Sequence, residues 1–448
     1  MQRFNIFKWL MILTAIVVGY SASAQSTINT YSNYTMYGFG ELQTQGTLPT
    51  RSMGGAGVAM RSGANINLLN PASYSEAIPK GILIDFGLDA SCFMNSQKQD
   101  DGSTAMSTYS TANFHDIALQ IPLYKGLGMG FSVTPYSQVG YSIMDSASVQ
   151  ESVNLGYVAY VYGGEGNITD VKLGLGYKIA KNLSVGAAAI YYWGQIDRAF
   201  SMSITPITSS GSYSTASGVS SYEFSKILWQ LGAQWSPIAN KKHVLTFGAT
   251  YDFGGDLNPR YTNTVSGTNS YVEIVATEET SYEEFRLPHQ FTIGAFYRTD
   301  KMGLALDYTY QNWSSNTITD KTITDVEVAY TNSSMVKAGV EYTPNRTDIR
   351  SLAKRITYRA GARYGNYYQT IGGETLPQYA ATFGVGVPIN MVGITKLDFG
   401  LEFGGIGNLG SVTVGDQSMN LVRQNYIKVA FGLTLFGNDY WFQRPKYD

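Results

Sequence analysis

The sequence is poor in the residues that most catalytic and metal sites use. It has one cysteine, Cys92, and three histidines, His115, His243 and His289, among 448 residues. A single cysteine excludes an intrachain disulfide framework and every metal site that needs several cysteines. The histidines do not have a metal-binding spacing, so each is interpreted as an interfacial or turn residue. The sequence therefore predicts a protein that is not an enzyme and that holds no metal or other cofactor.

Charged residues are also scarce. They make up 14% of the chain, whereas a typical soluble domain has about 25%. The formal net charge of -2 offers no basic surface for a nucleic acid. Glycine and tyrosine are abundant instead, with 48 and 34 copies. This composition excludes nucleic-acid partners and is unusual for a soluble exported protein.

Long apolar runs are missing after the first 25 residues. At the N-terminus, Arg3 and Lys8 flank a short polar start, an apolar run covers residues 10–19, and Ala22-Ser23-Ala24 resembles a cleavage site. The run is about half of the ~20 residues that an anchor helix needs. We therefore predict that residues 1–24 are a signal peptide and that the chain is exported.

Strict two-residue alternation dominates the rest of the chain. In "VKLGLGYKIA" (171–180), "MGLALDYTYQNW" (302–313) and "YIKVAFGLTLF" (426–436), one face is apolar and the other holds small, polar or charged residues. A soluble β-sandwich also alternates in this way. The long uninterrupted series, the aromatic residues at strand ends and the glycine-rich polar face favour a transmembrane β-barrel, which must close because lipid offers no hydrogen bonds.

The pattern predicts an all-β fold, an antiparallel barrel of about fourteen strands over residues 80–436. Segments 203–221 and 260–284 are interpreted as outward loops, and segments 180–183 and 237–243 as tight periplasmic turns. The predicted strands start near Ile82, Phe114, Gly128, Val171, Ser184, Phe224, Val244, Phe291, Gly303, Val336, Thr357, Ala381, Leu397 and Ile427.

Residues 25–79 do not alternate and are rich in glycine, serine and asparagine. A flexible tail could have this composition. A plug packed inside the lumen explains it better, because a plug has to bend sharply and bind its own backbone. In "NLLNPASY" (67–74), Asn70 can cap a turn and Pro71 can fix it. We therefore predict an N-terminal hatch inside the barrel, centred on Asn70-Pro71-Ala72.

The order of these features resembles the FadL family of outer-membrane transporters, which includes the TodX-type hydrocarbon channels. Family members pair a fourteen-strand barrel with an N-terminal hatch that carries an Asn-Pro-Ala motif, and Asn70, Pro71 and Ala72 match it. Segments 164–194 and 286–315 are similar to paired strands of the family. "RSMGGAGVAM" (51–60) and the ending resemble Bacteroidetes versions. The twelve residues 437–448 depart from the family pattern, which ends at the last strand.

The resemblance implies a function. Pro135 interrupts the third predicted strand, and a proline in a strand needs an edge, a bulge or a kink. In the family, a kink of this strand opens the wall sideways, so Pro135 and the nearby Gly140 are candidates for a lateral opening. A position above the membrane, where strands extend freely, is the alternative. The expected function is passive uptake of hydrophobic molecules, such as long-chain fatty acids, with release into outer-membrane lipid.

Two other uses of such a barrel remain open. FadL-like barrels also resemble PorV-type subunits or shuttles of secretion and assembly complexes, whose partners are proteins. A lumen filled by bulky side chains, with an exposed apolar patch outside, would favour that role; an open apolar pocket continuous with a wall gap would favour transport. A hydrophilic porin would need an unplugged, charged lumen. The sequence does not identify substrate-binding residues.

Overall fold

The computed structural model describes residues 29–99, 101–147, 157–205, 215–240, 242–268, 273–281, 285–315, 328–348, 350–389, 395–414 and 417–438. The predicted signal peptide lies outside the described residues, as does most of the predicted C-terminal tail.

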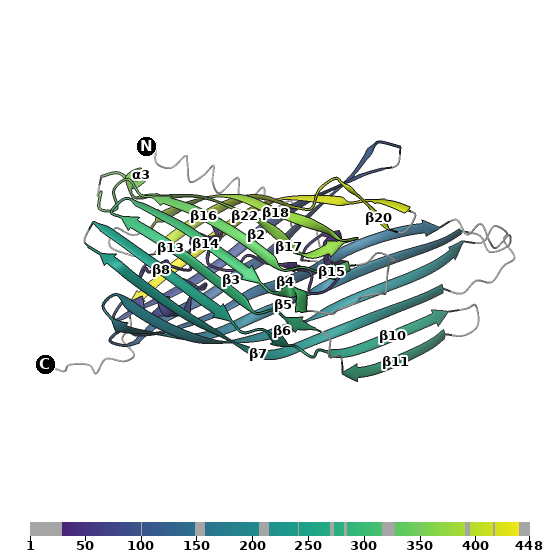
Figure 1. Ribbon diagram of the computed structural model, residues 1–448, viewed down its shortest axis with the longest axis horizontal. Helices are drawn as coiled ribbons and strands as arrows, with labels where there is room; N and C mark the ends of the chain where they lie inside the picture. Colours follow the sequence, from purple (N-terminus) through teal and green to yellow (C-terminus); the bar gives the residue numbers. More distant parts are fainter. Residues whose placement is uncertain are drawn as a thin grey trace.

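Within the described residues, fourteen antiparallel strands form a closed barrel (Figure 1). Each strand pairs with the next one around the wall, and the first strand pairs with the last over residues 81–97 and 422–438, which closes the barrel. All fourteen predicted starts lie inside these strands, so the fold prediction is confirmed. The wall strands are β2 (Gly81–Lys98), β3 (Thr104–Tyr124), β4 (Leu127–Ala147), β5 (Tyr157–Ala180), β6 (Leu183–Thr205), β7 (Thr215–Ala239), β8 (His243–Asp252), β13 (Gln290–Thr299), β14 (Met302–Gln311), β16 (Ser333–Tyr342), β17 (Thr357–Ile371), β18 (Glu374–Pro388), β19 (Lys396–Ile406) and β22 (Val422–Asn438).

The apolar face of the wall points outward. Leu173 and Leu175 of β5 are 51% and 48% exposed, whereas Lys172, next to Leu173, is 6% exposed. The same alternation in β14 exposes Leu304 and Leu306 and buries Asp307. A soluble sandwich would bury its apolar face, so this arrangement requires lipid around the barrel. The chain is a multi-pass transmembrane β-barrel of the outer-membrane type.

Large aromatic side chains also lie on the lipid side. Trp193, Trp229 and Trp235 are exposed, as is expected of residues that lie near a membrane interface. None of the described helices is long and apolar enough to cross a membrane.

The strands differ greatly in length around the wall. Strands β5, β6 and β7 have 24, 23 and 25 residues, whereas β8, β13, β14 and β16 have 10 each. About 9 to 11 residues cross the hydrocarbon core, so the long strands extend far beyond it on one side of the barrel (Figure 1). The short turns after Ala180 and Ala239 lie at the opposite end of the barrel, which we predict to face the periplasm.

Both predicted outward loops contain strands. Residues 215–221 of the first belong to β7, and the second contains the hairpin of β10 (Arg260–Thr268) and β11 (Glu273–Ser281), which continues the sheet from β7. The loop prediction is wrong there because Ser, Thr and Asn hide the strand pattern in a sheet that is not embedded in lipid. The remaining short elements are β9 (Gly255–Asp256), β12 (Arg286–Leu287), β15 (Val328–Tyr330), β20 (Ser411–Val414), β21 (Gln417–Asn420), η3 (Trp313–Ser315) and α3 (Leu352–Arg355).

The segment before β2 lies inside the lumen, as predicted. Its elements are η1 (Asn33–Met36), β1 (Glu41–Leu42), α2 (Leu48–Arg51) and η2 (Pro71–Glu76). Inner-wall glycines make room for it: a Cβ on Gly361 would come within 2.2 Å of the Met53 carbonyl carbon. The glycine-rich inner face is therefore the surface on which this segment packs.

Candidate functional site: a filled lumen beside a seam in the wall

The wall is incomplete between β3 and β4. Their ladder runs only from the pair Ile117 and Val133 to the pair Tyr124 and Leu127. Beyond it, β3 continues to pair with β2, and β4 continues to pair with β5. The facing edges, residues 104–116 of β3 and 134–147 of β4, have no ladder between them, and we call this gap the seam. The tip of the β2–β3 hairpin, dark blue in Figure 1, stands apart from β4 and β5.

Both residues predicted for a lateral opening lie on the β4 edge of the seam. The register between β4 and β5 shifts between Pro135 and Ser137, so Tyr136 is an extra residue in a bulge. Pro135 follows the last β4 residues that pair with β3, where a residue without an N–H group is tolerated. Gly140 lies five residues further along the same edge. The structure thus places both residues along the same edge of the gap.

Residues 29–45 fill the β4 side of the seam. Strand β1 pairs with β4 through Glu41 with Gln138 and Leu42 with Ser137. The Gln43 N–H donates to the Tyr136 carbonyl at 2.9 Å, and the Ser32 N–H donates to the Gly140 carbonyl at 2.9 Å. The inner segment therefore supplies backbone partners that β3 does not provide.

The same segment contacts the β3 side. The Asn113 side chain donates to the Asn29 carbonyl at 2.8 Å, and the Tyr31 ring stacks on Tyr109 with centroids 4.1 Å apart. Residues 29–45 consequently bridge the two edges of the seam.

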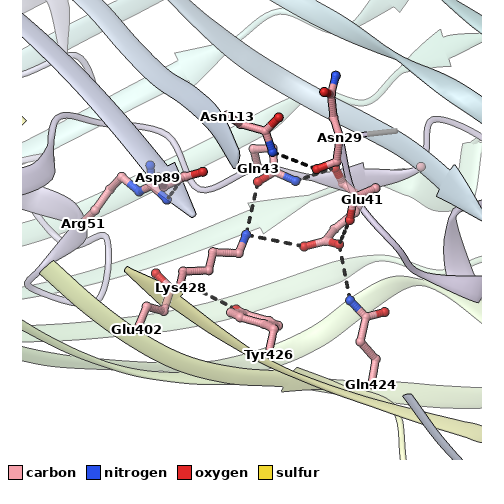
Figure 2. A network of polar contacts seen from close by, with 12 residues as sticks. Asn29, Glu41, Gln43, Arg51, Asp89, Asn113, Glu402, Gln424, Tyr426 and Lys428 are labelled. Carbon is pink, nitrogen blue, oxygen red and sulfur yellow. Dashed lines mark hydrogen bonds and ion pairs between the residues drawn. The ribbon is translucent and has the colours of Figure 1, made fainter. Parts of the chain in front are cut away.

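A polar network fixes this segment on its other side (Figure 2). Glu41 lies 3.8 Å from the Lys428 ammonium, which also donates to the Gln43 side chain at 3.3 Å. The Gln424 amide donates to the second Glu41 oxygen at 3.4 Å. Because Glu41 is buried, these contacts offset the cost of placing its charge inside the lumen.

The predicted Asn-Pro-Ala motif joins the inner segment to the wall between β7 and β8. The Asn70 side-chain oxygen accepts from the Ala72 N–H at 3.0 Å, which caps η2. Its amide donates to the carbonyls of Val58, Ala233 and Ala249 at 3.0, 3.2 and 3.4 Å. One fully buried side chain thus connects the turn, a second inner loop and two wall strands.

Two wall glycines allow this close approach. A Cβ on Gly232 would lie 2.1 Å from the Asn70 side-chain oxygen, and one on Gly186 would lie 2.5 Å from the Ala72 nitrogen. The sequence alone could not assign these glycines to the motif, because the match depends on the strand register.

A carboxylate holds the loop before the motif. Asp307 of β14 accepts hydrogen bonds from the N–H groups of Gly57 and Val58 at 2.6 and 2.8 Å. Such charge-assisted bonds are about twice as strong as neutral ones. Asp307 is therefore a principal anchor of the inner segment, and sequence reasoning missed it.

An ion-pair cluster joins the inner segment to the wall near the short turn between β5 and β6. Glu76 pairs with Arg61 and, at 2.9 Å, with Lys178. Burial opposes ionisation of Glu76, but the hydrogen bond from Lys178 and the charge of Arg61 outweigh it and lower its pKa. The cluster joins both ends of the 61–76 segment to β5.

Buried aromatic side chains fill the lumen beside the seam. The Phe39 ring, 0% exposed, contacts Phe285 edge-on with centroids 5.3 Å apart and lies 5.7 Å from Trp313. Tyr367 and Tyr368 donate to the Gly40 carbonyl at 3.0 and 2.6 Å. We call these five side chains the aromatic tier.

A cavity of about 180 Å³ remains next to the aromatic tier. Its lining is mixed: Leu42, Ile190 and Leu228 are apolar, whereas Asp170 and Lys172 are charged. The cavity is smaller than the roughly 300–1,000 Å³ typical of ligand pockets. We call it the chamber. Because residues 42–45 both line the chamber and lie along the seam, they separate one from the other.

One expectation about the histidines is wrong. A register shift between β2 and β3 leaves His115 as an extra residue, so His115 and Asp116 both point inward and are buried. Simple alternation would place one of them outside. His243 and His289 lie near strand ends, where each contacts a tyrosine hydroxyl.

This barrel, with its inner segment and its seam after the second wall strand, has the fold of FadL-type outer-membrane channels. Three solved structures are similar. One is the CymD monoaromatic hydrocarbon channel, with a TM-score of 0.57, 14% identity and coverage of 87% of this chain and 97% of that chain. A Pseudomonas aeruginosa FadL homologue has 0.58, 14%, 90% and 100%. The Ralstonia pickettii toluene transporter TbuX has 0.55, 16%, 90% and 98%.

The family model BamG matches residues 6–448, so the chain belongs to the BamG family. No curated protein matches the sequence. The predicted family resemblance is confirmed. At 14–16% identity, the solved structures show a shared fold rather than a shared substrate.

Proposed function

We propose that this BamG-family barrel is a passive outer-membrane conduit for hydrophobic molecules, closed in the state described here and opened by displacement of residues 29–45. The main observation that supports this proposal is the seam. It is a gap in the wall at the predicted kink, and residues 42–45 lie between it and the chamber. The solved relatives described as hydrocarbon channels and toluene transporters support the same class.

Release through the seam into the bilayer is the finer part of the proposal. A long acyl chain gains about 0.8 kcal/mol for each CH₂ removed from water. A path from the chamber through the seam avoids the aqueous periplasm, so this gain is not lost. Asn70, Pro71 and Ala72 would act as the fixed base of the hatch, and Pro135 and Gly140 as the edge along which the movable part lies.

The volume of the chamber limits the size of the molecule that it can hold. A cavity of about 180 Å³ that has charged residues in its lining does not fit a long-chain fatty acid. Transport of such a molecule requires residues 29–45 to leave, which would join the chamber to the seam. The proposal therefore treats long-chain fatty acids as cargo of the open state.

A second function is favoured by a different observation. The aromatic tier and the inner segment fill the lumen, and apolar residues such as Val219 of the long strand β7 and Val275 of the β10–β11 hairpin are exposed outside the barrel. Those are the features expected of a subunit that binds protein partners in an outer-membrane complex. In that role the seam would be permanently closed.

A deletion strain distinguishes the two functions. For a conduit, we expect uptake of radiolabelled palmitate or toluene to fall at least fivefold and to return when the gene is restored, while the set of outer-membrane proteins stays unchanged. Normal uptake of both compounds, together with loss of specific surface proteins, would contradict the conduit and support the partner role.

A further inference from the structure

The chamber contains polar groups whose hydrogen bonding is incomplete. Asp252 lies at the end of a chain of hydrogen bonds on the inner wall: Trp313 donates to Gln311 at 2.9 Å, Gln311 donates to Gln290 at 2.6 Å, and Gln290 donates to Asp252 at 2.6 Å. The indole N–H is only a donor. This fixes the orientation of both amides, so Asp252 must accept.

Two acceptor oxygens therefore remain available in one place. The second oxygen of Asp252 and the side-chain oxygen of Gln230 have no partner at full hydrogen-bond geometry, although the Gln230 side chain and the Lys172 ammonium both lie near enough to interact with the Asp252 carboxylate. The two residues face each other across the β7–β8 ladder, and both line the chamber. Gln230 is 4% exposed. Buried acceptors without partners are costly, so this pair is suited to a ligand with several donors, such as an ammonium group.

A cation without a hydrogen-bond partner lines the same chamber. Within the described part of the chain, the Lys337 ammonium forms no hydrogen bond or ion pair, although its side chain lines the cavity and the carboxylates of Asp307 and Asp252 lie near enough to interact with its charge. The other two cations of the lining have partners: Lys172 donates to the Leu68 carbonyl at 3.2 Å, and Arg363 pairs with Glu402. Lys337 is therefore suited to an anionic group of a ligand.

The strand register separates the two sites. Asp252 aligns with Ser333 of β16 through β13 and β14, and Lys337 follows Ser333 by four residues. That is about 13 Å along the strand and about 14 Å across three strand spacings. Both side chains extend toward the cavity, which reduces the distance between the Asp252 carboxylate and the Lys337 ammonium. A ligand whose two charges lie on adjacent carbon atoms still cannot contact both groups.

We propose that the chamber binds a compact zwitterion with well-separated charges, of the ω-amino-acid or dipeptide class, with its ammonium at Asp252 and Gln230 and its carboxylate at Lys337. The apolar residues of the chamber, among them Leu228 and Ile190, would contact the carbon chain between the charges. The cavity volume of about 180 Å³ limits the ligand to a small one. The site lies in the same chamber as the proposed transport path, but the proposal rests on the polar groups of the lining and does not require that hydrophobic molecules are transported.

Isothermal titration of the purified full-length protein in detergent tests the proposal with four matched probes. 6-Aminohexanoate has both charges far apart, and its isomer norleucine has them adjacent. Hexylamine and hexanoate each keep one charge. We expect 6-aminohexanoate to bind at least tenfold more tightly than each of the other three.

Two variants assign the ends of the ligand. Lys337→Met should reduce 6-aminohexanoate binding to the level of hexylamine and leave hexylamine unchanged. Asp252→Asn should reduce it to the level of hexanoate. Lys301→Met, in the exposed β13–β14 turn, is the control and should bind like the unmodified protein.

Three outcomes would overturn the proposal: no binding of 6-aminohexanoate at millimolar concentration, which would mean that water alone fills the chamber; equal binding of the four probes; or unchanged binding in both variants. Heat-modifiable migration of each variant in electrophoresis checks that the barrel is folded.

Discussion

The inner segment has two halves that are held in different ways. Residues 46–79 are bound by side chains from complete parts of the wall, including Asp307 of β14, Gln234 of β7 and Lys172 of β5. Residues 29–45 lie along the seam, where β3 and β4 have no ladder, and their main chain takes the position of a missing neighbour of β4. The contrast indicates a fixed base and a removable closure.

The cost of moving each half follows from these contacts. To unseat residues 46–79, several buried hydrogen bonds to wall side chains must break while the wall remains intact. To move residues 29–45, the short β1 pairing, the aromatic packing around Phe39 and the side-chain bonds to Glu41 and Gly40 must be given up. These residues lie beside a part of the wall that already lacks a ladder, so they can leave sideways without breaking one. We therefore expect residues 29–45 to open first.

The largest effect on the fixed base should come from Asp307→Ala. The change removes two charge-assisted bonds and leaves the buried N–H groups of Gly57 and Val58 without a partner. We expect local opening to become easier by about 3 kcal/mol. Hydrogen exchange at residues 55–60 should then be on the order of a hundredfold faster.

Asp307→Asn is the matched control for that change. It keeps an acceptor oxygen and loses the charge, so its effect on exchange should be clearly smaller. If exchange at residues 55–60 were the same in Asp307→Ala as in the unmodified protein, residues 46–79 would not be held by this carboxylate.

A smaller effect is expected for Asn70→Ala. The variant loses the cap of η2 and the longer bonds to the carbonyls of Ala233 and Ala249. Loss of such a cap costs about 1–2 kcal/mol. Exchange at residues 70–77 should become about tenfold faster, and the barrel should still insert.

Asn345→Ala, in the turn between β16 and α3, serves as the control, since its side chain also binds a nearby backbone N–H. Unchanged exchange and unchanged detergent sensitivity in Asn70→Ala would leave Asn70-Pro71-Ala72 as an ordinary turn.

The wall strands could be predicted from the sequence because the lipid imposes the same two-residue period on each of them. Asn70, Pro135 and Gly140 could be proposed as site residues, since a motif or a proline in a strand is visible in one segment, and their roles stay predictions. Asp307, Gly186, Gly232 and Lys337 could not be assigned, because their importance depends on which residues lie opposite them in a register that sequence does not reveal. The predicted position of His115 was wrong because β3 contains one extra residue there, which turns the His115 side chain into the lumen.

The seam could be predicted in part, because a proline within a strand is visible in a single segment of the sequence. Pro135 indicated a kink in the third wall strand, but nothing in the alternating residues 104–116 shows that they have no partner on one side. The β10–β11 hairpin was missed because polar strands outside the membrane lack the apolar face that marks the others.

The most direct test of a removable closure at the seam is a reversible cross-link. Leu42→Cys and Ser137→Cys place cysteines on Cα partners of β1 and β4 in a Cys92→Ser background. Antiparallel partners are about 4.5–5.5 Å apart, within the range for a disulfide. A control pair, Ser201→Cys with Ser217→Cys, lies on the continuous β6–β7 ladder. We expect the oxidised β1–β4 pair to reduce palmitate uptake at least tenfold, with recovery on reduction, and the control pair to have no effect. Full uptake with the β1–β4 disulfide formed would contradict the claim that residues 29–45 move to open the seam.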